Sequence, residues 1–170
     1  FMPRTVSISK QAIIDASIDL IRESGHEAFN ARALAKRIGC STQPIFSNFK
    51  NMEDLLENVL KDTLDIYNAF VADSIRSGES EPAYKANGRA YIRFAMEERN
   101  LFKLLFMRDR TAEPNHVEES TFYDVLPLIM KGTGLDRERA ALFHFAMWSV
   151  VHGIASMVVT SYEKPDMELI

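Results

Sequence analysis

The sequence predicts an all-α protein. Apolar residues recur at helical spacing along most of the 170 residues, strand-like alternation is absent, and glycine and proline stand mostly between the periodic segments. Hydrophobic residues make up 46% of the chain, which favours a packed core over disorder. We therefore expect an N-terminal three-helix, helix-turn-helix domain over residues 1–51 and a helical-bundle domain over residues 52–170.

Capping residues and glycines mark the ends of three short helices at the start of the chain. A side-chain oxygen just before a helix can accept from its unpaired N–H groups, and a glycine just after it can end the helix. The expected helices cover residues 10–24 (cap Ser9, end Gly25), 31–38 (cap Asn30, end Gly39) and about 42–47 (cap Ser41).

A long fourth helix is expected from Met52 to about Ser77, with Asn51 as its cap. Residues 78–82 (GESEP) read as a loop. Further helices are expected at about 83–98, 100–109, 116–131 and 136–162, with breaks at Asn100, at 111–115 and at 132–134.

Charge and cysteine content bound the functional class only loosely. The net charge of −4 argues weakly against nucleic acid, but residues 1–61 carry eight basic and seven acidic side chains, whereas the remainder carries twelve and seventeen. The lone cysteine, Cys40, excludes an intrachain disulfide, fits a reducing cytoplasm and reads as a small buried residue. No apolar run approaches the roughly 20 residues of a membrane span, so we expect a cytoplasmic protein without membrane contact.

The most informative stretch is residues 29–56, FNARALAKRIGCSTQPIFSNFKNMEDLL. It places two short helices around a tight turn at 38–41, where Gly39 provides the backbone freedom. The apolar residues that would lock these helices against the first one are Leu34, Ala35, Ile38, Ile45 and Phe49.

The remaining face of the third helix is short and polar, which suits a DNA major groove. Gln43 can contact adenine through two hydrogen bonds, and the ring of Pro44 can touch a thymine methyl. Thr42, Ser47 and Asn48 complete this face. The basic residues that could contact phosphate around it are Arg32, Lys36, Arg37 and Lys50.

Residues 29–56 resemble the DNA-binding signature of the TetR family: an aromatic, a capping residue, "ALAKRIG", a recognition stretch, then an aliphatic–aromatic pair, Phe and Leu-Leu. The Gln43–Pro44 pair also resembles the one in the tetracycline repressor. The family usually has Tyr at Phe46, whose hydroxyl commonly meets a phosphate, and Lys at Met52, so we expect weaker backbone binding. The resemblance implies DNA contacts from Arg32, Lys36, Ser41, Thr42, Gln43, Pro44, Phe46, Ser47, Asn48 and Lys50.

The segment from Trp148 to Gly153 resembles a Trp-x-x-x-His-Gly pattern in one branch of TetR effector domains. The resemblance implies a homodimer that binds a palindromic operator in double-stranded DNA as a repressor and is released by a small, largely apolar effector. Helix 52–77 would transmit the change, and copies would pair through a stripe of Ala146, Val150, Ala155, Val158 and Val159. Candidate ligand contacts are Tyr91, Phe94, Phe102, Phe122, Tyr123, Trp148 and His152, although most aromatic residues here are also expected in the core.

Other functional classes have less support. His144 and His152 lie about 80° apart around a helix, which disfavours a metal site. Nucleotide-binding, nucleophile-elbow and zinc-protease motifs are absent, so we expect neither an enzyme nor a cofactor. The alternative is a helical protein-interaction module that retains the helix-turn-helix as a scaffold without specific DNA binding.

Overall fold

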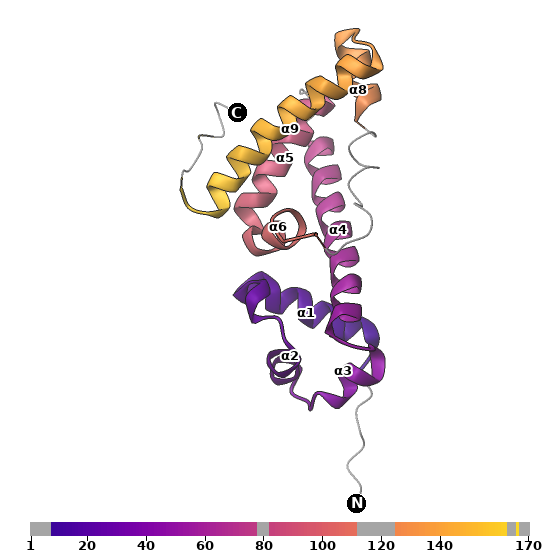
Figure 1. The fold of residues 1–170 in the computed structure, drawn as a ribbon, viewed down its shortest axis with the longest axis vertical. Helices are drawn as coiled ribbons and strands as arrows, with labels where there is room; N and C mark the ends of the chain where they lie inside the picture. The colour runs from indigo at the N-terminus through magenta and orange to yellow at the C-terminus, as the bar shows by residue number, and fades with distance from the viewer. Residues whose placement is uncertain (1–7, 78–81, 112–124, 163–165, 167–170) are drawn as a thin grey trace, which may run out of the picture. The chain divides into compact units, whose positions relative to one another are not determined.

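The computed structural model describes residues 8–77, 82–111, 125–162 and 166, and these residues form helices without any strand (Figure 1). The all-α prediction is confirmed. The contacts divide the chain into two compact units. The first unit comprises the chain up to Tyr67 together with Glu98–Met107. The second unit comprises Asn68–Glu97 and the chain from Arg108 onward.

The first unit contains the predicted helix-turn-helix. Its elements are α1 (Lys10–Ser24), the 3-10 turn η1 (His26–Ala28), α2 (Ala31–Ile38), α3 (Gln43–Asn48), the beginning of α4 (Met52–Ser77) and α6 (Arg99–Phe106). Helix α6 therefore packs with α1, although the chain reaches it only after α5.

Three of the predicted caps are confirmed. The side-chain oxygen of Ser9 accepts from the N–H of Ala12 at 3.1 Å, and that of Asn30 accepts from the N–H of Ala33 at 3.0 Å. The oxygen of Asn51 accepts from Asp54 at 2.8 Å. These bonds fix where α1, α2 and α4 begin.

The predicted cap of the third helix is wrong. Helix α3 begins one residue later than expected, Thr42 rather than Ser41 is its N-cap, and the Thr42 side chain makes no capping bond. Pro44 occupies one of the first helical positions and has no N–H to offer to a capping oxygen. The backbone carbonyl of Thr42 instead accepts from Ile45 and Phe46.

Apolar side chains from each helix close the core of the first unit. The hydroxyls buried among them are satisfied, because Ser17 donates to the carbonyl of Ile13 at 2.7 Å and Thr63 to that of Val59 at 2.6 Å. Fully buried core residues include Ile13, Ile21, Leu34, Ile45, Leu55, Val59, Leu101 and Phe102.

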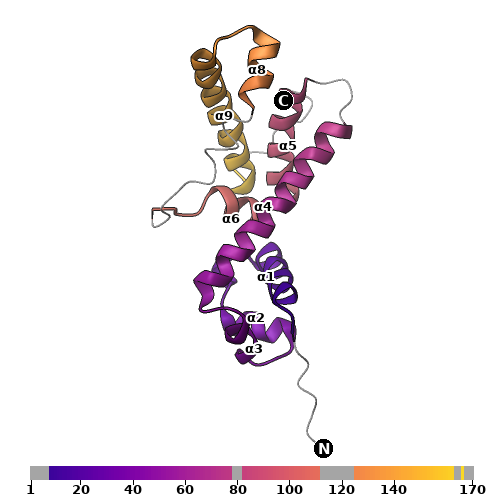
Figure 2. The same cartoon turned by 90° about the vertical axis from the view of Figure 1, so that its right-hand side faces the viewer.

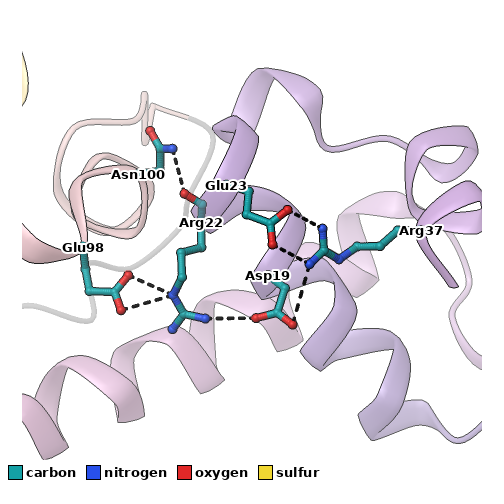
Figure 3. A network of polar contacts seen from close by, with 6 residues as sticks. All are labelled: Asp19, Arg22, Glu23, Arg37, Glu98 and Asn100. Carbon is teal, nitrogen blue, oxygen red and sulfur yellow. Dashed lines mark hydrogen bonds and ion pairs between the residues drawn. The ribbon is translucent and has the colours of Figure 1, made fainter.

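A polar network ties α1 to α6 (Figure 3). Arg22 donates through Nε to both carboxylate oxygens of Glu98, at 3.1 and 2.9 Å, and through Nη1 to Asp19 at 3.0 Å. The amide of Asn100 donates to the backbone carbonyl of Arg22 at 2.9 Å. Asn100 was expected to interrupt the chain between helices, but it lies inside α6, and the break falls at Glu98.

The second unit is built around α5 (Ala83–Glu97), α8 (Leu126–Thr133) and α9 (Arg137–Val159). Helix α9 lies along α5 and contacts α8 (Figures 1 and 2). The expected helix 116–131 falls partly outside the described residues. Its expected break at 132–134 is displaced, because α8 continues through Gly132 and ends where Gly134 adopts the left-handed conformation, with φ of +72°.

Helix α9 is long enough and apolar enough to cross a membrane by length and composition alone. The sequence-based statement that no apolar run approaches a membrane span was therefore wrong by this measure. Few residues of the apolar stretch are buried in the single chain.

Candidate nucleic-acid interface

The turn between α2 and α3 depends on Gly39. This residue has φ of +78° and ψ of 33°, the left-handed region that residues with a β-carbon avoid. Its N–H and that of Cys40 both donate to the carbonyl of Ala35, at 2.9 and 3.0 Å. These bonds close α2 and reverse the chain so that α3 crosses beside it.

Helix α3 has one buried and one exposed side. Ile45 and Phe49 are 0% and 2% exposed and hold the helix in the core, as predicted. Gln43, Phe46 and Ser47 lie at i, i+3 and i+4 on the opposite side and are exposed. The outward face therefore contains two of the four predicted polar residues, Gln43 and Ser47, and one aromatic ring.

Two candidate base contacts, Ser47 and Asn48, also make hydrogen bonds within the chain. The hydroxyl of Ser47 donates to the carbonyl of Gln43 at 2.9 Å, so its oxygen can still accept. The amide nitrogen of Asn48 donates to the carbonyls of Pro44 at 2.8 Å and Ile8 at 3.5 Å. Asn48 thus joins the end of α3 to the residue before the α1 cap and keeps only its amide oxygen for other contacts.

The remaining candidates on this side differ in exposure. Ser41 is exposed, whereas Thr42 and Pro44 are half-buried. These three residues could contact the DNA backbone or the groove. The exposed side chain of Gln43 has greater freedom to reach the edge of a base.

The four basic residues predicted to contact phosphate differ in whether they form an ion pair within the chain. Arg32, Lys36 and Lys50 are exposed, and their side chains have no ion-pair partner among the described residues. The guanidinium of Arg37 instead donates to both carboxylate oxygens of Glu23 at 2.7 Å, and Asp19 lies 3.9 Å away (Figure 3). This bonding raises the pKa of Arg37 and lowers that of Glu23. In this structure Arg37 therefore joins α2 to α1, and its contact with phosphate stays a prediction.

The structure adds one cation that the sequence analysis missed. The ammonium group of Lys10, the first residue of α1, lies 5.0 Å from the centre of the Phe49 ring. It therefore contributes positive charge close to the end of α3. No local motif marks this residue, because Lys10 and Phe49 are far apart in the sequence and only the fold brings them together.

The candidate ligand residues fall into separate groups. The hydroxyl of Tyr91 forms a 2.8 Å hydrogen bond with Nδ1 of His152, and the Trp148 ring stacks on that imidazole with centroids 5.1 Å apart. Phe94 is buried against Phe70 in the second unit. Phe102 is buried beside another phenylalanine in the first unit, and Phe122 and Tyr123 lie outside the described residues.

His144, which lies on α9 like His152, also has a tyrosine partner. Nδ1 of His144 is 2.9 Å from the hydroxyl of Tyr84, so α5 and α9 are joined by two tyrosine–histidine bonds. Burial lowers the pKa of His144 and raises that of Tyr84. Among the described residues, no cluster of His, Cys, Asp or Glu has the arrangement of a metal site.

A left-handed glycine turn, an exposed helix face and exposed cations on the neighbouring segments together define a helix-turn-helix DNA-binding protein. Residues 13–59 match the family described as bacterial regulatory proteins, tetR family, and residues 84–167 match the tetracyclin repressor-like C-terminal domain. The chain belongs to the TetR family and is a DNA-binding transcriptional regulator. A search of curated proteins found no match.

Proposed function

We propose that the protein is a homodimeric repressor that binds a palindromic operator and is released by a small, largely apolar ligand. The observation that carries this proposal is the outward face of α3, where Gln43 and Ser47 are exposed. Arg32 and Lys36 on α2 and Lys50 just after α3 are exposed as well. In this reading Gln43 contacts a base and the three cations contact phosphates.

The exposed side of α9 supports pairing of two copies. Leu142, Phe145 and Val150 are 69%, 57% and 57% exposed, and Phe143, Met147 and Met157 are also exposed. A contiguous apolar surface of this kind is typical of an interface. The stripe expected from the sequence needs correction, since Ala155 and Val159 are 0% exposed and pack inside their own chain. A two-fold dimer would place two recognition helices about 34–36 Å apart, one turn of DNA.

The arrangement around His152 supports a ligand site between α5 and α9. Tyr91 and Trp148 flank this histidine, so the group combines aromatic surface with hydrogen-bonding atoms. Such a mixture is common in sites for largely apolar ligands. In this proposal ligand binding alters the spacing of the two DNA-binding units and lowers operator affinity, about 5- to 150-fold for a typical coupling between sites.

The first experiment titrates the protein against labelled DNA from upstream of its own gene, at several salt concentrations. We expect binding that exceeds binding to random DNA and falls linearly with the logarithm of salt concentration. Gln43→Ala should reduce specific affinity, and Lys36→Ala should lower the salt slope by about one. Lys131→Ala, an exposed lysine of α8, is the matched control and should leave both unchanged.

Two outcomes of this titration would redirect the proposal. If the upstream DNA is bound no more tightly than random DNA, and a genome-wide selection of bound fragments also recovers no preferred DNA, the protein-interaction module becomes the better explanation. If Gln43→Ala binds the selected operator as tightly as the natural protein, Gln43 does not read a base.

Dimer formation is tested separately by size measurement in solution. Phe145→Lys places a charge on the exposed side of α9 and should give monomers. Met96→Lys changes a side chain on α5 that is 47% exposed and should leave the dimer intact. Natural protein that is monomeric at the concentrations needed for DNA binding would contradict the proposal.

The ligand site can be followed through the single tryptophan. Because Trp148 is the only tryptophan in the chain and stacks on His152, its fluorescence should change when an apolar compound binds there. Compounds that change this fluorescence should also release the labelled DNA. Release without any fluorescence change would place the ligand elsewhere.

A further inference from the structure

Phe46 is the one large apolar side chain on the outward face of α3. It is 48% exposed, while its neighbours Ile45 and Phe49 are almost completely buried. It shares its side of the helix with Gln43 and Ser47, at i−3 and i+1. Packing within the chain therefore leaves much of this ring in water, on the surface proposed to enter DNA.

A phenyl ring limits what Phe46 can recognise. It has no hydrogen-bond donor or acceptor, so it cannot bond a phosphate or the polar edge of a base. The C5-methyl of thymine is the apolar group that base pairs display in the major groove, and aromatic side chains can contact it.

We propose that Phe46 reads the C5-methyl group of a thymine in each half-site, close to the adenine that Gln43 contacts. This inference rests on the proposed function, because it needs α3 to lie in the major groove. Side chains at i and i+3 on a helix are about 5–6 Å apart at their β-carbons. Successive base pairs rise by about 3.4 Å. The two contacts therefore fall on the same or neighbouring base pairs, within about two steps.

The test removes only the methyl group from the DNA. An operator selected with the natural protein is synthesised with each thymine replaced in turn by deoxyuridine, and dissociation constants are measured by anisotropy. Loss of one buried methyl should weaken binding about fourfold. The same replacement in both half-sites should weaken it about fifteenfold, since each subunit contributes one contact. The sensitive position should lie within two base pairs of the position where Gln43→Ala relaxes base preference.

Variants of Phe46 connect the methyl effect to this side chain. Phe46→Ala should bind the thymine and deoxyuridine operators equally, whereas Phe46→Leu, which keeps an apolar side chain, should retain part of the difference. Met96→Ala removes a similarly exposed apolar side chain from α5 and should retain all of it. Because Phe46 is half-exposed, both Phe46 variants should keep the helical circular dichroism of the natural protein.

Each remaining outcome overturns the proposal in a distinguishable way. Specific binding with no thymine sensitive to methyl removal rejects the Phe46 contact and leaves the regulator intact. Methyl sensitivity that survives in Phe46→Ala assigns the contact to another group, for which the ring of Pro44 is the neighbouring candidate. Failure to select any preferred DNA rejects both the contact and the proposed function.

Discussion

The two units of the chain differ in how far they bury their apolar residues. In the first unit, Ile13, Ile45 and Leu55 are completely buried, and every helix contributes to a closed core. In the second unit, α9 buries residues such as Ala140 and Ala155 but exposes Leu142 and Phe145. The first unit therefore buries most of its large apolar residues within one chain, whereas α9 leaves one apolar side exposed, the side that we propose to pair with a second copy.

The largest expected effect tests the closed core directly. Ile45→Ala removes a fully buried side chain from α3 and should lower the free energy of unfolding by about 2–5 kcal/mol. Met96→Ala, at a site 47% exposed on α5, should change it by less than about 0.5 kcal/mol. Urea denaturation measures both. Equal losses in the free energy of unfolding would contradict the description of Ile45 as a core residue and Met96 as a surface residue.

A pair of glycine substitutions should give effects of opposite sign. Gly39→Ala places a β-carbon on a left-handed residue and should cost about 1–2 kcal/mol. Gly132→Ala lies inside α8 with open space around it and should stabilise the protein by about 0.4–1 kcal/mol. Thermal or urea denaturation would check the signs. A stabilising Gly39→Ala would contradict the turn described here.

A smaller effect is expected from the ion pair between α1 and α6. Arg22 and Glu98 have 37% and 23% exposed side chains, so solvent screens their attraction. A double-mutant cycle with Arg22→Ala and Glu98→Gln should give a coupling energy of about 0.5–1 kcal/mol. The exposed pair of Asp73 and Arg76 on α4 is the control and should give a coupling near zero. Equal couplings would remove any special role for the α1–α6 contact.

The smallest expected effect concerns pH and the second unit. Burial lowers the pKa of His144 below its ordinary value of 6.5, so the unfolded chain binds this proton more readily than the folded one. The free energy of unfolding should fall as pH decreases from 6.5 to the folded-state pKa, and then level off. His144→Gln should show less of this loss between pH 7.5 and 5.5. Identical pH dependence in both proteins would contradict the assignment.

The DNA-binding part could be predicted closely because its signals are local. Side chains such as Asn30 and Asn51 cap helices within three residues, and Gly39 sets the turn through its own backbone. The third helix begins one residue later than expected, with Thr42 as its N-cap and Pro44 at one of its first positions. Local chemistry thus accounts for the three correct caps, although it did not fix the start of this helix to the residue.

Features that depend on distant parts of the chain could not be predicted. Arg37 pairs with Glu23 only because α1 and α2 pack together, and Lys10 lies near Phe49 for a similar reason. The outer side of α9 was also misjudged, since apolar residues surround nearly the whole helix and periodicity cannot select the buried face. Only three-dimensional contacts distinguish Ala155 from Leu142 there.

The placement of α6 has a consequence for building hybrid regulators. A chimaera that joined residues 1–51 to another effector domain would leave behind the helix that covers α1, together with Glu98 and Asn100. The transplanted segment would lose the two polar contacts of Arg22 with these residues. The apolar side chains of α1 that pack against α6 would become exposed to water. Exchange of specificity between such proteins therefore calls for a matched α6 from the donor, or for substitutions confined to the outward residues of α3.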